Sequence, residues 1–385
     1  MKIMHVIESL GIGGAERLLV TLLPALQRQG HDVMVVVRTG RMDLAATLEA
    51  AGVPVARLPA RHKWNLVGTA LAISRLAHQH CIDLIHAHLY FPAQSTALVK
   101  LLRLHSAATV VTFHNLAYAD GVNSGALRLR LKKRLAACLY PKGFDRKIAV
   151  SGAVAAHYRA ALGLHAIEIV HNPVDLEAID SLQLHKVRKL GEAVHIVVPG
   201  RLVPEKGHTD LLQALALLRD QGLAFTATIA GDGPLRDQLQ QHIRTAGLQE
   251  VVSFTGILHY EKLLATVATA DIVVIPSRFE GFGLAAIEAM ALSRPVIVTA
   301  VGGLVEIVDD GISGVMVPSR QPRQLASALQ RLMASAALRE TLGNAGRKRV
   351  EQAFALPELA QTMDTLYRQT VALNQARLTL SAGNR

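Results

Sequence analysis

The sequence VHIVVPGRLVPEKGHTDLLQALALLRDQGLAFTATIAGDG, residues 194–233, shows in one stretch how this chain folds. It begins with the β-branched run VHIVVP and continues through a loop into HTDLLQALALLRDQG, where leucine and alanine recur at helical spacing. A glycine ends that helical pattern, and FTATIA follows as a second β-branched run. A strand, a helix and a second strand in this order predict a right-handed βαβ unit with parallel strands.

The same alternation continues over the chain and predicts two parallel sheets. In the first half the expected strands are KIMHVI, HDVMVVV, VPVARL, DLIHAH, ATVVTF, DRKIAV and IEIV, and the second half adds EVVSF, DIVVIP, PVIVT and GVMVP. We therefore predict an α/β protein with two tandem Rossmann-like domains facing a cleft, where ligands meet the carboxyl ends of the strands. The segment HNPVDLEAIDS is the expected linker, so the predicted domains are 1–172 and 173–355, followed by a segment 356–385.

The composition indicates a folded protein without a membrane-spanning segment. Half of the 385 residues are hydrophobic, yet no window holds the roughly 18 apolar residues that a spanning helix needs. The N-terminal segment MKIMHVIESLG lacks the long apolar core of a signal peptide. Cys81 and Cys138 have no metal-binding or redox spacing, so we expect buried thiols in a reducing compartment, the cytoplasm.

The net charge of +11 lies in the first half of the chain. Residues 1–172 hold 20 Lys and Arg against 9 Asp and Glu, whereas residues 173–385 hold 21 of each kind. A nucleic-acid partner is not expected, because the chain has no nucleic-acid-binding motif and only 4% aromatic residues. An anionic membrane surface or a phosphorylated acceptor explains the charge. The stretch LRLRLKKRLAACLY, residues 127–140, fits a helix on an anionic bilayer and equally a solvated helix face.

Two carboxylates stand out in SRFEGFGLAAIEAMALSRPVIVT, residues 277–299. Glu280 lies in the loop after a buried strand, and Glu288 lies about one turn inside the next helix, with its Cβ tilted back towards the helix start. That helix is expected to begin near Gly283, where free N–H groups suit a phosphate. Carboxylates are pure acceptors, so both suit the hydroxyls of a ribose or a sugar. The alternative is a capping carboxylate and a solvated helix residue.

Two cations, Arg201 and Lys206, lie on the loop between the strand and the helix of residues 194–220. Cations at the carboxyl end of a strand can neutralise a diphosphate without a metal ion. The loop is not a P-loop, because the glycine spacing and the Ser or Thr after the lysine are missing. Ordinary surface charges are the alternative. No metal site is expected, since the chain has no HExxH, paired cysteines or Asp-x-Asp.

Two positions of the first half are candidates for the cleft. The turn ESLGIGGAERLL brings Gly14 to the start of the first helix, although its glycines also fit a plain tight turn. His114 comes one residue beyond the strand ATVVTF, where it is placed to contact a substrate. His86 and His88 are interpreted as alternating residues at a strand end.

Together these motifs resemble the retaining glycosyltransferases of family 4, which have the two-Rossmann architecture called GT-B. The resemblance covers nearly the whole chain. It rests on GGAE at 13–16, GRLVPEKG at 200–207, GDGP at 231–234, PVIVTAVGGLVEIVDDGISGVMVP at 295–318, and the pair Glu280 and Glu288 with seven residues between them.

The resemblance implies where a nucleotide-diphosphate sugar binds in the second domain. Glu288 would hold the ribose hydroxyls, and Glu280 the transferred sugar. Arg201 and Lys206 would hold the diphosphate. Backbone N–H groups would assist them around Phe282, Gly283 and Leu284.

The resemblance also implies roles for the base pocket and the first domain. Residues 232–258, beginning with Asp232, would line the base pocket. Gly14 would approach the diphosphate and the acceptor, and His114 would face the sugar. The last helix, LPELAQTMDTLYRQTVAL, would cross back onto the first domain.

The implied reaction is transfer of a hexose with retention, without a metal or other cofactor, from a UDP- or GDP-linked sugar to a glycan or lipid-linked acceptor. Such a step belongs to cell-surface polysaccharide or glycolipid synthesis. It would take place in the cytoplasm or peripherally on the inner face of the cytoplasmic membrane. Two alternatives stay open: a sugar-nucleotide 2-epimerase of the same architecture, and a non-catalytic regulatory subunit that binds nucleotide sugars.

Overall fold

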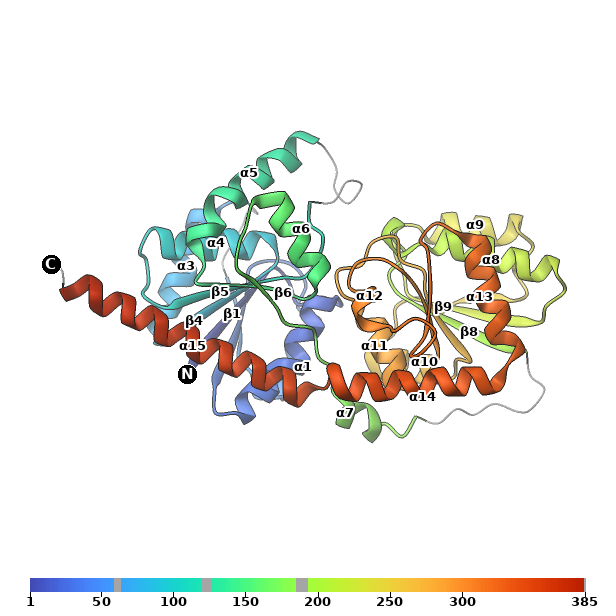
Figure 1. Ribbon diagram of the computed structural model, residues 1–385. Coiled ribbons are helices and arrows are strands. Elements are labelled where there is room, and N and C mark those ends of the chain that lie inside the picture. Colours follow the sequence, from blue (N-terminus) through green and yellow to red (C-terminus); the bar gives the residue numbers. More distant parts are fainter. Residues whose placement is uncertain (59–63, 119–125, 185–192, 384–385) are drawn as a thin grey trace. The chain divides into compact units, whose positions relative to one another are not determined.

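The computed structural model describes residues 1–58, 64–118, 126–184 and 193–383 (Figure 1). The chain divides into two compact units, of which unit 1 consists of Met1–Pro173 and Leu356–Arg385 and unit 2 of Val174–Ala355. Each unit is built around its own parallel sheet.

Unit 1 contains a sheet of seven strands within the described residues, and all neighbouring pairs are parallel. In spatial order the strands are β3 (Val55–Arg57), β2 (Asp32–Val37), β1 (Lys2–Ile7), β4 (Leu84–His88), β5 (Ala108–Phe113), β6 (Arg146–Ala149) and β7 (Ile167–Ile169). At the centre, Ile3 of β1 is paired with Val33 of β2 and with Leu84 of β4. Strands β4 and β5 are buried along their whole length, because parallel sheets are covered on both faces.

Helices cover both faces of the unit 1 sheet (Figure 1). They are α1 (Gly14–Arg28), α2 (Ala45–Ala50), α3 (Leu66–Gln79), α4 (Tyr90–Leu101), α5 (Ala126–Gly143), α6 (Gly152–Leu162) and α15 (Leu356–Gly383). One face packs against α1, α2 and α15, and the other packs against α3 and α4. In α1 the buried residues Leu18, Leu22 and Leu26 recur every four positions, which produces the apolar stripe that faces the sheet.

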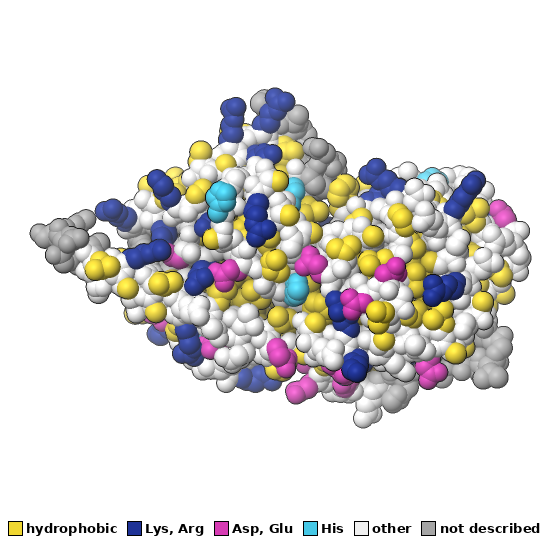
Figure 2. All heavy atoms as spheres, in the orientation of Figure 1, with side chains coloured by type: hydrophobic (Ala, Val, Ile, Leu, Met, Phe, Trp, Pro, Cys, Tyr) yellow, Lys and Arg dark blue, Asp and Glu magenta, His cyan; other side chains and the backbone are white. Residues whose placement is uncertain are grey.

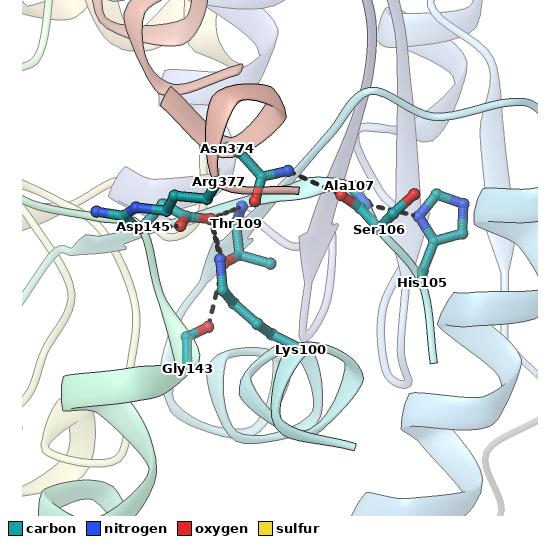
Figure 3. Close-up of polar contacts among 9 residues, drawn as sticks. All are labelled: Lys100, His105, Ser106, Ala107, Thr109, Gly143, Asp145, Asn374 and Arg377. Atoms are coloured by element: carbon teal, nitrogen blue, oxygen red, sulfur yellow. Dashed lines mark hydrogen bonds and ion pairs between the residues drawn. The ribbon is translucent and has the colours of Figure 1, made fainter. Parts of the chain in front are cut away.

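Helix α15 belongs to unit 1 although it follows unit 2 in the sequence. Near its end, Arg377 forms an ion pair with Asp145 at 3.3 Å, and Asn374 donates to the carbonyl of Ser106 at 2.8 Å (Figure 3). Asp145 also accepts a hydrogen bond from the backbone N–H of Thr109 at 2.9 Å. These contacts attach α15 to the residues that directly precede β5 and β6.

Unit 2 contains a six-stranded parallel sheet in the part that is described. In spatial order its strands are β10 (Val252–Phe254), β9 (Phe225–Ala230), β8 (Val194–Pro199), β11 (Ile272–Ile275), β12 (Val296–Thr299) and β13 (Val315–Val317). Its helices are α7 (Leu176–Ser181), the 3₁₀ turn η1 (Pro204–Lys206), α8 (His208–Asp220), α9 (Arg236–Thr245), α10 (Tyr260–Ala268), α11 (Leu284–Ala291), α12 (Leu304–Ile307), α13 (Pro322–Ala334) and α14 (Ala336–Ala353). One face packs against α8, α9 and α13, whereas α10 and α11 pack against the other, with α14 beside α11.

The two sheets share one strand order. In each, the first strand lies between the second and the fourth, which is the arrangement of a Rossmann-like domain. The predicted α/β fold with two Rossmann-like domains is therefore confirmed. The predicted strands are present, and edge strands are shorter than expected, as in VPVARL, where only Val55–Arg57 is paired.

The expectation of buried thiols is wrong, because Cys81 and Cys138 are both exposed. Cys81 lies in the turn after α3 at φ 51°. Cys138 lies on α5, where Ala136 and Tyr140 are the residues that turn into the core. Among the described helices, none is both long and apolar enough to cross a bilayer.

Candidate functional site

Two loops of unit 2 meet at the carboxyl ends of the neighbouring strands β8 and β11. The loop after β8 contains Glu205 and Lys206, and the loop after β11 contains Arg278 and Glu280. The backbone N–H of Arg278 donates to the carbonyl of Glu205 at 2.7 Å. Nζ of Lys206 donates to Oε2 of Glu280 at 2.6 Å. The structure thus brings together two of the predicted site residues, one of each charge.

The Lys206–Glu280 pair is largely shielded from water, since the side chains are 24% and 14% exposed. Oε2 of Glu280 also accepts a hydrogen bond from Oγ of Ser277 at 3.1 Å. Both recorded hydrogen bonds to this carboxylate reach the same oxygen, so within the described residues Oε1 receives none. Oε1 of Glu280 can therefore accept a hydrogen bond from a ligand hydroxyl while Oε2 stays bonded to Lys206.

The start of α11 requires glycine at the position before the helix. Gly283 has φ +125°, and a Cβ there would lie 2.6 Å from Cδ2 of Leu304. Leu284 then begins α11, as the sequence predicted, and the first N–H groups of a helix have no partner inside it. Phe282 is buried, with its ring 5.8 Å from that of Phe354. Glu288 lies one turn further along α11 and is only 8% exposed, so it is not the solvated residue of the alternative interpretation.

Arg201 and Asp232 occupy two loops that are bonded to each other. The backbone N–H of Leu202, the residue after Arg201, donates to the carbonyl of Asp232 at 3.0 Å. The Arg201 side chain is exposed, and no ion pair to it is recorded among the described residues. The carboxylate of Asp232 is occupied within the protein, because Gly233 donates to it at 2.7 Å and Arg236 at 3.0 Å.

A second ion pair, between Arg278 and Asp210, holds the loop that contains Glu280. The guanidinium of Arg278 donates to Asp210 of α8 at 2.9 and 2.6 Å, and this pairing raises the pKa of Arg278. Because Asp210 is on the helix that follows Lys206, the pair connects the two loops a second time. No motif in the sequence pointed to Ser277, Arg278 or Asp210. Their only signal was position, since each lies within four residues of a predicted site residue.

The remaining predicted residues, Gly14 and His114, belong to unit 1. Gly14 is exposed and is the first residue of α1, after the N-cap Gly13. His114 directly follows β5 and is partly exposed. Its Nε2 lies 2.9 Å from Nδ1 of His88.

Three buried histidines of unit 1 and the partly exposed His114 form a cluster that the sequence did not reveal. His5, His86 and His88 are at most 1% exposed. Nδ1 of His5 lies 3.0 Å from Nε2 of His88, and His86 is bonded to Oγ1 of Thr112 at 2.7 Å and to a tyrosine hydroxyl of α15 at 2.6 Å. Burial lowers the pKa of His5 and of His114 to about 3, and those of His86 and His88 well below the ordinary value.

The spacing of this cluster is compatible with a metal ion, although no metal-binding motif pointed to it. One ring nitrogen of each of His5, His86 and His88 lies within 4.8 Å of the others. Yet both nitrogens of His88 and both of His86 already lie at hydrogen-bonding distance from protein groups. We therefore interpret the cluster as a hydrogen-bonded polar network.

Comparison with known proteins gives matches over most of the chain. Residues 12–178 match the family model "Glycosyltransferase Family 4", and residues 183–349 match "Glycosyl transferases group 1". The D-inositol 3-phosphate glycosyltransferase of Paenarthrobacter aurescens is 30% identical over 304 residues, which cover 75% of this chain and 73% of that protein. The alpha-D-kanosaminyltransferase of Streptomyces kanamyceticus is 30% identical over 174 residues, so the alignment spans only 45% of its length.

Solved structures have the same fold. The Anabaena protein Alr3699/HepE, crystallised with UDP-glucose, has a TM-score of 0.81 at 22% identity, and the alignment covers 96% of this chain and 100% of that one. At this identity the likeness concerns the fold, and it confirms the GT-B architecture predicted from the sequence.

Proposed function

Because this chain belongs to the family 4 glycosyltransferases, we propose that it moves a sugar, with retention and without a metal ion, from a nucleotide-diphosphate sugar to a glycan or lipid-linked acceptor. The observation that carries the proposal is the 2.6 Å contact between Lys206 and Glu280 beside the glycine turn that begins α11. Cation, carboxylate and helix N-terminus occur together where a Rossmann-like sheet binds its ligands.

In the proposed complex, unit 2 holds the donor. Arg201 and Lys206 neutralise the diphosphate, with help from the N–H groups of Phe282, Gly283 and Leu284. Glu288 accepts hydrogen bonds from the ribose and Oε1 of Glu280 from the sugar. Uridine is the first base to test, because the neighbour Alr3699/HepE was crystallised with UDP-glucose.

The proposed chemistry rests on charge that develops as the anomeric C–O bond breaks. The departing diphosphate gains negative charge, and Lys206 and Arg201 stabilise it more in the transition state than in the ground state. Glu280 keeps the ammonium of Lys206 in place through their contact. The acceptor attacks the same face that the diphosphate leaves, and a phosphate oxygen takes the acceptor's proton.

The acceptor is proposed to bind unit 1, which carries the excess positive charge. Lysine and arginine side chains lie over α5 (Figure 2). On its outer side Arg128, Arg130 and Arg134 are exposed together with Leu131, which is 59% exposed. Such a mixture of cations and leucine suits the surface of an anionic bilayer, which would present a lipid-linked acceptor in polysaccharide or glycolipid synthesis.

Sedimentation with liposomes tests the membrane part of this proposal. We expect binding to vesicles with anionic lipid at low salt, and loss of that binding in an Arg128→Gln/Arg130→Gln/Arg134→Gln variant. Equal binding to neutral and anionic vesicles would show that the arginines form an ordinary solvated helix face.

Calorimetric titration with UDP and with GDP, in EDTA, tests the donor site. We expect one nucleotide to bind without a metal, Lys206→Met to weaken it, and Lys262→Met, an exposed lysine on α10, to leave it unchanged. Binding that requires a divalent cation would contradict the metal-free proposal. Turnover then separates the alternatives: a transferase needs an acceptor, a 2-epimerase converts the donor alone, and a regulatory subunit does neither.

A further inference from the structure

The helices on one side of the unit 1 sheet carry positive charge without any carboxylate. Helices α3, α4 and α5 follow one another on that side, away from α1 and α15 (Figure 1). Together they contain eight Lys and Arg residues and no Asp or Glu. In contrast, α1, α2 and α15 contain four cationic and four acidic residues, so their charges cancel. Most of the excess positive charge of unit 1 therefore lies in α3, α4 and α5.

The start of α3 adds exposed apolar side chains to the same side. Val67 and Leu71 are 54% and 48% exposed, and their separation of four positions places them on one face of the helix. Trp64, in the turn just before the helix, is 43% exposed. Buried residues of α3 such as Ile73 and Ala77 pack on the sheet with the other face. A row of large apolar groups is thus exposed to solvent along the first half of α3.

Phe91 connects this apolar row to the basic surface of α5. Its ring lies edge to face with the ring of Trp64, with 5.3 Å between the centroids. Nζ of Lys132, on α5, lies 5.7 Å from the centroid of the same Phe91 ring. Leu131, beside Lys132, is exposed among the arginines of α5. The two helices therefore share one continuous surface, which is apolar over α3 and cationic over α5.

A bilayer that contains anionic lipid matches both parts of this surface. Its headgroups neutralise the cations, its acyl region receives Val67 and Leu71, and tryptophan is enriched at the boundary between the two. A second copy of this chain, docked through the same face, would place cations against cations, and like charges repel. A nucleic acid would pair with the cations but leave the apolar row in water.

We propose that unit 1 docks on anionic membranes through α3 and α5 together, with Trp64, Val67 and Leu71 inserted as an apolar anchor. This inference deepens the proposed function and rests on it, since there the bilayer presents the acceptor. Helices α3 and α4 begin beyond the carboxyl ends of β3 and β4, so docking through their starts turns the ligand-binding edge of the sheet towards the lipid. A lipid-linked acceptor then reaches this edge while its lipid stays in the bilayer.

Fluorescence tests the anchor, because Trp64 is the only tryptophan of the chain. We expect its emission maximum to shift to the blue when the full-length protein is mixed with vesicles of phosphatidylcholine and phosphatidylglycerol. Brominated lipids in these vesicles should quench the emission. An unchanged, unquenched spectrum while the protein sediments with the anionic vesicles would overturn the proposal, since the cations alone would then hold the protein. Absence of sedimentation at low salt would overturn it as well.

Salt and a matched pair of variants separate the anchor from the charges. At about 0.5 M salt, where charge interactions reach only roughly 4 Å, the original protein should keep part of its vesicle binding. Under these conditions we expect Val67→Ser/Leu71→Ser to bind about 10-fold more weakly or worse. Leu373→Ser/Leu380→Ser, which replaces two exposed leucines of α15 on the neutral side, should bind like the original. Equal binding by the two variants would overturn the insertion of α3.

Nucleotide titration of the same samples keeps the two proposals apart. A blue shift of Trp64 without binding of UDP or GDP would count against the proposed transferase and leave the docking face standing. Nucleotide binding without any change in the Trp64 emission on anionic vesicles would leave the donor site standing and overturn the anchor.

Discussion

Corresponding neighbouring strands of the two Rossmann-like sheets carry or lead into different kinds of polar side chains. In unit 2 the loops after the neighbouring strands β8 and β11 hold Lys206 and Glu280, which are charged, paired and partly exposed. In unit 1 the corresponding strands β1 and β4 hold His5 and His88, which are neutral and buried. Equal topology thus allows polar side chains of distant segments to meet in both sheets, while burial decides whether those side chains are charged or neutral.

The largest effect on activity is expected from removing the charge of Lys206 in unit 2. Lys206→Met should lower kcat by about 100- to 1000-fold, because the charge that stabilises the leaving diphosphate is lost. Donor turnover measures it, normalised to the folded fraction since Glu280 loses its partner. Activity of Lys262→Met should stay at the original level. Comparable activity of the two variants would remove Lys206 from the mechanism.

Arg201→Gln should weaken nucleotide binding without changing the stability of the fold. The side chain is exposed, so the free energy of unfolding should hardly change. Loss of a charged hydrogen bond to the diphosphate should raise the Kd of the bound nucleotide roughly 10- to 100-fold. Calorimetry checks this against Arg331→Gln, an exposed arginine on α13. A Kd that Arg201→Gln does not alter would make Arg201 an ordinary surface charge.

The buried histidines of unit 1 should make stability depend on pH. Burial lowers the pKa of His5 from 6.5 to about 3, so between these values the unfolded chain binds a proton that the folded one does not. Stability is therefore full above pH 6.5 and falls as the pH is lowered towards 3, by about 2 kcal/mol per such ring between pH 7 and pH 5.

Urea denaturation of His5→Gln measures that contribution. The variant should lose about 2 kcal/mol less than the original protein on going from pH 7 to pH 5, whereas His80→Gln, with an exposed histidine, should follow the original. Identical pH dependence of all three proteins would mean that His5 is protonated in the folded state.

The smallest expected effect concerns Glu288. Glu288→Gln keeps the size of this buried side chain and removes its charge, so nucleotide affinity should fall about fivefold. Glu340→Gln, an exposed position on α14, serves as the control. A lower Tm with unchanged affinity would assign Glu288 to the packing of α11 instead of the ribose.

Residues close in sequence were predicted well. Glu280 and the start of α11 at Leu284 followed from the order strand, glycine turn, helix, because that order places a helix N-terminus at the edge of a parallel sheet. The contact of the Glu280 carboxylate with Lys206 did not follow from the sequence. Lys206 is 74 positions from Glu280, and only the pairing of β8 with β11 brings the two together.

By itself, the sequence determined the two Rossmann-like units, the strands and helices and the family of this protein, since periodicity and local motifs carry that information. Tertiary structure decided the rest. His5 lies 83 positions from His88, and no motif near His5 points to a contact. Only the pairing of β1 with β4 brings the two rings to hydrogen-bonding distance. Exposure of Cys81 and Cys138 was likewise decided by the turn and the helix face on which they fall. Periodicity is local, whereas hydrogen bonds across a sheet and burial depend on which distant segments become neighbours.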